Sequence, residues 1–183
     1  MQLLFTGMIL IFIDINFTVG TGVIGLVPDF VGYIYIYKGL FELTEESPHF
    51  QQVLPLSKVM VVVMAVIYAM DALSITTASQ SLSILLGMIT TAISLYTIYH
   101  IVRGVLDIET SKNIDLFGEK LFSTWKMWAV FATLSVMPVP VTALSVILIF
   151  ISLIMAIIFL VTFEKSKRQY YALLETSTNK TNL

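Results

Sequence analysis

The chain is divided into long apolar runs, and most of its charged residues fall in the segments between or after them. The last run, Thr142 to Phe163, has 22 residues without a charge, enough to cross the ~30 Å hydrocarbon core of a bilayer as a helix. Apolar residues make up 57% of the sequence and charged residues 12%, with a mean hydropathy of +0.92. These values lie outside the range of a soluble domain of this size, so we predict an integral membrane protein.

Six such runs are present, and each is predicted to form one transmembrane helix. They are Leu3 to Phe17, Val23 to Phe41, Leu56 to Ala78, Ser81 to Val102, Leu121 to Met137 and Thr142 to Phe163. A re-entrant pair is the alternative for the first two, because the first is short and the second contains Pro28 and Asp29. Nothing basic precedes the first run, so we expect it to be retained rather than cleaved as a signal peptide.

The predicted fold is an all-α integral membrane bundle of six transmembrane helices. A single transmembrane helical domain is expected at 1–163, followed by a charged and partly disordered cytoplasmic tail at 164–183. All ten basic residues fall in the connection between the second and third runs or at its edges, in the connection between the fourth and fifth or at its edges, and in the tail. The positive-inside rule then gives both termini in the cytoplasm and three helical hairpins whose tight turns face outward.

The connection before the third run contains a helix start. Ser47 followed by Pro48 is typical of a helix N-terminus. Pro55 is a suitable first residue for the third span, so we expect a short interfacial helix between the two prolines. This helix is interpreted as a connector on the headgroups, and a docking surface is the alternative.

No motif of a known enzyme class is present. Zero Cys excludes disulfides, thiolate catalysis and Cys-based metal sites. The sequence has no His-Glu-x-x-His helix, no P-loop and no Gly-x-Ser-x-Gly elbow. We therefore expect a non-enzymatic protein without a metal or cofactor. His100 and Arg103 are interpreted as ordinary interface residues, with contact to a phosphate or lipid headgroup as the alternative.

Two stripes of small residues are predicted to pack helices together. The second run carries Gly22, Gly25, Asp29, Gly32 and Gly39 on one helical face. The fourth run carries Ser83, Gly87, Thr90, Ser94 and Thr97 at spacings of three and four. For the second stripe, a polar path lined by hydroxyls is the alternative to a packing seam.

Three acidic residues are separated from all the other charges. Asp14, Asp29 and Asp71 are predicted to be the only ionisable side chains in the outer half of the bundle. A charged Asp at mid-helix costs ~2.5 to 3.5 kcal/mol on insertion scales, which favours a functional role. Tyr68 and Ser74 lie three residues on either side of Asp71 and offer hydroxyl partners.

These five residues are the predicted site, which would bind a cation or an amine-bearing solute or couple to protons. The alternative for Asp14 and Asp29 is a place near helix ends, where they satisfy backbone groups or meet water. Asp71 carries the stronger prediction, because its own helix face supplies the two hydroxyls.

The motif Pro28-Asp29-Phe30-Val31-Gly32-Tyr33, followed by Gly39-Leu40 and Ser47-Pro48-His49-Phe50, resembles a family of small, uncharacterised bacterial polytopic membrane proteins. This resemblance implies a bacterial cytoplasmic membrane and no particular activity. Six spans with both ends inside are also similar in architecture to the substrate-binding subunits of energy-coupling-factor vitamin transporters. Those subunits carry an Ala-x-x-x-Ala docking motif on their first helix, and Leu3 to Phe17 contains no Ala.

The predicted function is transport-type, either a carrier or a substrate-binding subunit with an acidic polar site in the outer half. Expected partners are the lipid bilayer, a small cationic solute and a partner membrane protein. The near-neutral formal charge of -2 argues against nucleic acid. The alternatives are a non-enzymatic interaction protein (a regulator, assembly factor or immunity protein) and a lipid-handling enzyme that uses His100, Arg103 and the inner acids.

Overall fold

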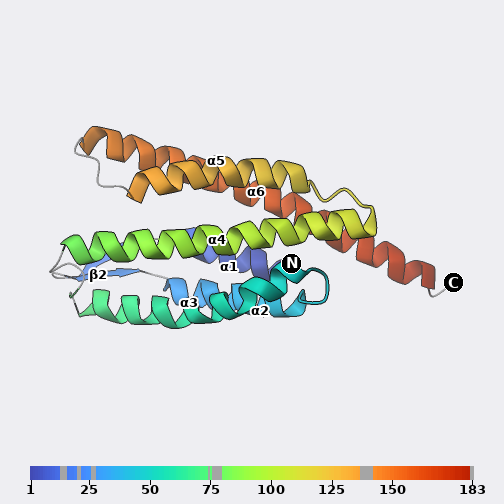
Figure 1. Cartoon of the computed structure of the whole chain (residues 1–183), viewed down its shortest axis with the longest axis horizontal. Helices are drawn as coiled ribbons and strands as arrows, with labels where there is room; N and C mark the ends of the chain where they lie inside the picture. Colours follow the sequence, from blue (N-terminus) through green and yellow to red (C-terminus); the bar gives the residue numbers. More distant parts are fainter. Residues whose placement is uncertain are drawn as a thin grey trace.

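The computed structural model describes residues 1–12, 16–19, 22–25, 28–73, 75, 80–136 and 142–181. Within these residues the chain forms helices whose axes follow the long axis of the molecule, together with one short hairpin (Figure 1). The elements are α1 (Gln2–Phe12), β1 (Asn16–Val19), β2 (Gly22–Gly25), α2 (Asp29–Glu42), α3 (Pro48–Ala72), α4 (Gln80–Lys112), α5 (Gly118–Val136) and α6 (Thr142–Thr181). The predicted bundle of helices is confirmed, whereas the short hairpin departs from the all-α prediction.

Three helices are long and apolar enough to cross a membrane. Their apolar segments are Pro48–Ala72, Ser81–Lys112 and Val146–Glu175. Of the others, α1 is apolar but has 11 residues, α2 has 14, and α5 contains Glu119, Lys120 and Lys126. The membrane class is thus supported by three helices, while six crossings stay a prediction.

The hairpin corrects the prediction for the first two apolar runs. β1 and β2 pair antiparallel, with Asn16 opposite Gly25 and Val19 opposite Gly22. The physical reason lies in the composition, since this segment is rich in Val, Ile and Thr, which favour extended backbone, and its glycines lower helix propensity. Gly22 and Gly25 therefore lie on a strand, and the predicted helical glycine face begins only at Asp29.

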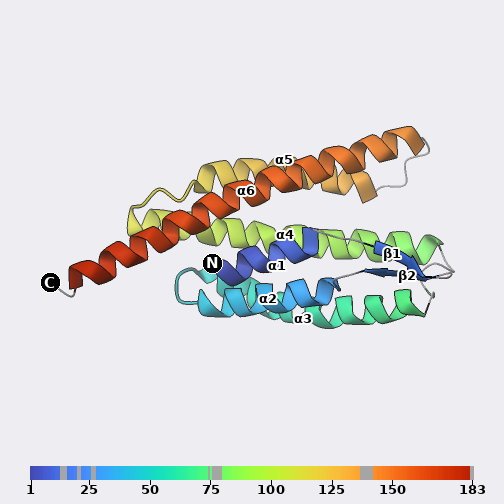
Figure 2. The same cartoon turned by 180° about the vertical axis from the view of Figure 1, so that it is seen from behind.

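The glycines that remain on this face bring α1 and α2 together. A Cβ added to Gly32 would lie 2.7 Å from Ile11 Cγ1 and 3.0 Å from the Gly7 carbonyl oxygen. One added to Gly39 would lie 2.7 Å from the Leu4 backbone nitrogen. The face is thus used for packing inside the molecule, where α1 also contacts α6 (Figure 2).

Helix α3 begins where the sequence predicts. The Ser47 hydroxyl accepts a hydrogen bond from the His49 backbone N–H at 3.1 Å, and Pro48 occupies the first turn. The separate interfacial helix is not formed, because α3 continues through Pro55 to Ala72. Val53 and Ser57 on either side of the proline are fully buried, so tertiary packing outweighs the hydrogen bond that proline cannot donate.

The tail also differs from its prediction, because α6 remains helical to Thr181. Ser166 and Tyr170 are buried against the bundle, and the Tyr170 hydroxyl donates to Glu46 at 3.3 Å. Lys167 places its ammonium 4.0 Å from the centre of the Phe5 ring. These contacts hold the turns of α6 that follow Phe163 against α1 and the α2–α3 turn.

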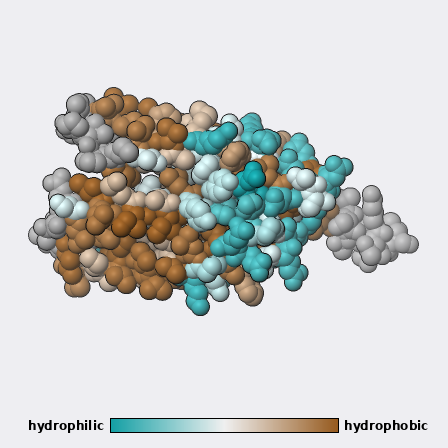
Figure 3. Space-filling view, viewed as in Figure 1, coloured by the Kyte–Doolittle hydropathy of each residue, from teal (hydrophilic) through white to brown (hydrophobic). Residues whose placement is uncertain are grey.

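Hydrophilic surface gathers at one end of the molecule. In Figure 3 it covers the end where α2 leads to α3 and α4 leads to α5, whereas the other end is mostly hydrophobic. Many large apolar side chains on the outer faces of α3 to α6 are exposed, such as Val62 at 62% and Phe150 at 61%. An apolar surface this extensive is expected of a protein embedded in lipid.

Candidate functional site

Two of the predicted acids line one pocket near the apolar end of the bundle. Asp29 from α2 and Asp71 from α3 lie on a hollow of about 210 Å³ whose remaining wall is formed mainly by α4. Its other lining residues are Met64, Ile67, Ser83, Leu86, Gly87 and Thr90. Two carboxylates, two hydroxyls and an otherwise apolar wall suit a small cation or a protonated amine.

The two carboxylates lie at opposite kinds of helix end. Asp29 is the first residue of α2, where the positive end of the helix dipole stabilises an anion. This position agrees with the helix-end alternative for that residue. Asp71 is the penultimate residue of α3, where the negative end of the dipole opposes a carboxylate. Of the two carboxylates, that of Asp71 is therefore stabilised less by its own helix.

Of the other three predicted site residues, the structure describes only Tyr68. Tyr68 is absent from its lining, and its ring packs edge-on against Phe30 with the ring centres 5.9 Å apart. It thus supports the start of α2 beside Asp29. Asp14 and Ser74 lie outside the residues that the structure describes.

The hydroxyls in the pocket come from α4, which the sequence analysis left out of the site. Ser83 and Thr90 belong to the predicted small-residue stripe, so the sequence did indicate these two residues. The stripe was interpreted mainly as a packing seam, which did not include their place in the pocket. Thr90 donates to the Leu86 carbonyl oxygen at 2.9 Å, which leaves its oxygen able to accept or to coordinate a cation. One turn further, the Ser94 and Tyr33 hydroxyls are 2.5 Å apart and join α4 to α2.

A second polar cluster lies toward the hydrophilic end. The two imidazoles, His49 and His100, place their Nδ1 atoms 3.1 Å apart. The Ser47 hydroxyl donates to Asp107 Oδ2 at 2.5 Å, and His49 Nε2 lies 4.0 Å from the same oxygen. Across the described part of the chain, no three His, Asp or Glu side chains are placed to hold a metal ion. The cluster therefore joins the start of α3 to α4.

Searches against known protein families, curated proteins and solved structures found no match to this chain. The function of the pocket must therefore be inferred from its own chemistry.

Proposed function

We propose that this chain is a small transport-type membrane protein, a carrier or a substrate-binding subunit, that binds a cation or an amine-bearing solute at Asp29 and Asp71. The observation that carries the proposal is the shared pocket, in which two acids from different helices meet hydroxyls of a third. A pocket of this kind between helices is where bundles usually bind small ligands.

The position of Asp71 adds to this support. A carboxylate in the last turn of a helix is disfavoured by typically about 0.3 to 1 kcal/mol, and a bound cation offsets this effect. The hydroxyl oxygens of Ser83 and Thr90 extend the same set of hard oxygen ligands around the hollow. Asp71 is therefore the residue on which the proposed binding depends most.

In the proposed arrangement the chain crosses a bacterial cytoplasmic membrane six times, with both termini in the cytoplasm. The hydrophilic end then faces the cytoplasm, in line with the confinement of all ten basic residues to three segments. The hairpin β1–β2 extends the short helices α1 and α2 toward the apolar end (Figure 2). Interrupted spans of this kind are tolerated where they are buried in protein or line a cavity, and β2 packs against α3.

The alternative is a non-enzymatic interaction protein that binds partner helices through its small-residue faces. The contacts of Gly32 and Gly39 with α1 weaken it, because that face is already covered within the chain. It would require another surface, such as the exposed faces of α3 or α6.

A ligand panel separates the two functions. The full chain, purified in detergent, is melted in the presence of monovalent and divalent cations and small amines. A ligand that binds only the folded state stabilises it, by about 2.7 kcal/mol at a concentration 100 times its Kd. The melting temperature rises as a result. We expect at least one cation or amine to do so. No shift with any of them, together with capture of one stoichiometric membrane partner, would favour the alternative.

A further inference from the structure

Two buried donors on neighbouring helices have no acceptor. The Nε atom of Arg103 on α4 and the Nε1 atom of Trp125 on α5 are both buried, and neither has a hydrogen-bond partner in the described part of the chain. Leaving a buried donor unpaired is unfavourable, and more so for a charged group. Two such donors near one aromatic ring, that of Phe122, indicate a site for an acceptor from outside the chain.

Both donors belong to one cationic and aromatic cluster around Phe122. The Arg103 guanidinium carbon lies 5.9 Å from the centre of the Phe122 ring, and the Lys126 ammonium lies 4.8 Å from it. The Trp125 ring stacks on Phe122 with the ring centres 5.8 Å apart. Tyr99 completes the cluster, 5.2 Å from Trp125.

Among the residues that the structure describes, no carboxylate forms an ion pair with this cluster. The ion pairs of the described residues join His49 to Asp107, Lys112 to Glu46 and Arg168 to Glu164. Arg103 and Lys126 take part in none of them. Asp107, one turn from Arg103, instead accepts from Ser47. The acceptor that fits here carries negative charge, and phosphate is the anion that guanidinium recognises best.

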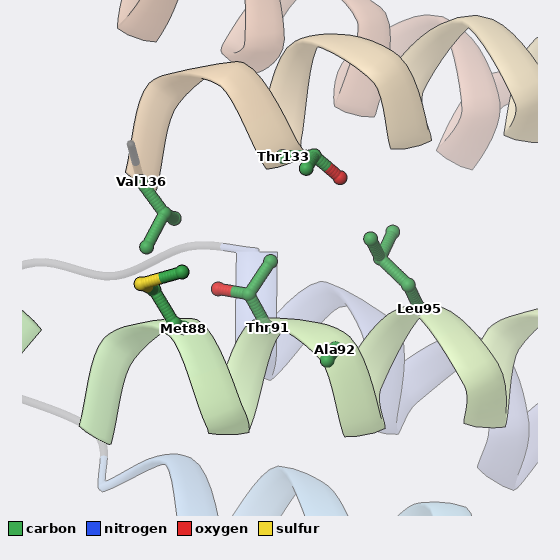
Figure 4. Close-up of a pocket in the computed structure, with 6 residues that line it drawn as sticks. All are labelled: Met88, Thr91, Ala92, Leu95, Thr133 and Val136. Carbon is green, nitrogen blue, oxygen red and sulfur yellow. The ribbon is translucent and has the colours of Figure 1, made fainter. Parts of the chain in front are cut away.

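An apolar groove between the same two helices lies farther toward the apolar end (Figure 4). Its volume is about 210 Å³, and its lining residues are Met88, Thr91, Ala92, Leu95, Thr133 and Val136. Leu95, Tyr99 and Arg103 follow one another at intervals of four on α4, so the groove and the cationic cluster share one helix row. The eight helical steps from Leu95 to Arg103 span about 12 Å, within the ~15 Å hydrocarbon depth of one leaflet.

We propose that this surface binds one anionic phospholipid of the cytoplasmic leaflet. Its phosphate accepts hydrogen bonds from Arg103 and Trp125 beside the Lys126 ammonium, and one acyl chain lies along Tyr99 and Leu95 into the groove. The lipid site is separate from the Asp71 pocket. It rests on the proposed function only for the embedding of the chain in the membrane and its orientation there. Loss of cation binding at Asp71 would therefore leave lipid binding intact.

Native mass spectrometry of the full chain in detergent tests the site. Dioleoyl phosphatidylglycerol is added, and we expect one retained lipid per chain, held more tightly than dioleoyl phosphatidylcholine. Arg103→Gln should weaken phosphatidylglycerol binding about tenfold, the loss expected of one charged hydrogen bond. Trp125→Phe keeps the aromatic ring, removes the N–H and should weaken it less. Lys165→Gln, an exposed cation on α6, is the matched control and should bind as wild type does.

The groove is tested separately by filling it. Ala92→Phe should reduce retention of the lipid, while Val62→Phe on the exposed face of α3 should leave it unchanged. These variants and Trp125→Phe test the proposal even if Arg103→Gln fails to fold. Displacement of the lipid by equimolar inorganic phosphate would show a site for a soluble anion and overturn the proposal. Wild-type lipid retention by Trp125→Phe and Ala92→Phe would overturn it as well.

Discussion

Gly32 lies at a close contact between α1 and α2, and its lack of a side chain is required there. Gly32→Leu would force its side chain against Ile11 and the Gly7 carbonyl. Overpacking commonly costs about 1 to 3 kcal/mol, and a backbone atom that cannot move aside raises the cost. We expect a strongly lowered melting temperature and a broadened elution profile in gel filtration.

The matched control for this change is Gly87→Ala. A Cβ at Gly87 would meet only Val136 Cγ1, at an ordinary contact distance of 3.7 Å, so this variant should melt close to wild type. If Gly32→Leu were well folded and had merely lost self-association, the glycine face would serve an interface between chains instead of the α1–α2 contact.

At the scale of the elements, two carboxylates hold the connection from α4 to α5, since Asp115 Oδ1 accepts from the Phe117 backbone N–H at 2.9 Å and Glu109 binds the residues on either side of it. Glu109 Oε2 accepts hydrogen bonds from the backbone N–H groups of Leu116 at 3.0 Å and Gly118 at 2.7 Å. Between them, Phe117 has a φ of 58°, which is unfavourable for a bulky residue. Glu109 therefore holds a strained turn at the start of α5.

Glu109→Ala should destabilise the protein by about 0.5 to 2 kcal/mol, the usual cost of removing a helix cap. The melting temperature in one fixed detergent measures this loss. Glu45→Ala removes an exposed acid from the α2–α3 turn and should have little effect. Equal melting of the two variants would mean that the backbone of the turn is held without the Glu109 carboxylate.

The elements also show what the sequence can and cannot predict. The start of α3 follows from Ser47 and Pro48, because a cap is a local interaction. The β1–β2 hairpin was missed because the three-residue spacing of Gly22 and Gly25 suits a helix. A signal for it was present, in two short β-branched runs, Thr18-Val19 and Val23-Ile24, separated by three residues of which two are glycines. There the spacing of the glycines favours a helix and the β-branched residues favour a strand, and the segment forms strands.

Across the whole molecule, the segregation of charge to one end was predictable from the positions of the basic residues alone. That Asp29 and Asp71 share a pocket was predicted only in general terms, as isolated acids that come together in one cavity. The contribution of Ser83 and Thr90 needed the tertiary structure, since the face that α4 turns toward α2 and α3 cannot be deduced from its own sequence. Local sequence signals thus predict where helices begin and where charged residues lie, whereas the site forms only when the helices pack together.

Orientation can be tested in whole cells, because the chain has no Cys to interfere with labelling. We expect Ile75→Cys, in the turn after α3, to react with a membrane-impermeant maleimide added from outside. Glu45→Cys, in the α2–α3 turn, should react only after permeabilisation. The reverse pattern would overturn the N-in, C-in arrangement and place the hydrophilic end outside.

Equilibrium binding of the most strongly stabilising cation or amine to the purified chain tests the central claim most directly. Wild type should bind one ligand at the Asp29–Asp71 pocket, and Asp71→Asn should weaken binding at least about tenfold while the protein stays folded, since one charged contact is worth about 1.5 to 3 kcal/mol. Glu45→Gln, which removes an exposed acid far from the pocket, should bind as wild type does. Unchanged binding in the triple variant Asp14→Asn, Asp29→Asn and Asp71→Asn would contradict the acidic site and leave the interaction-protein function ahead.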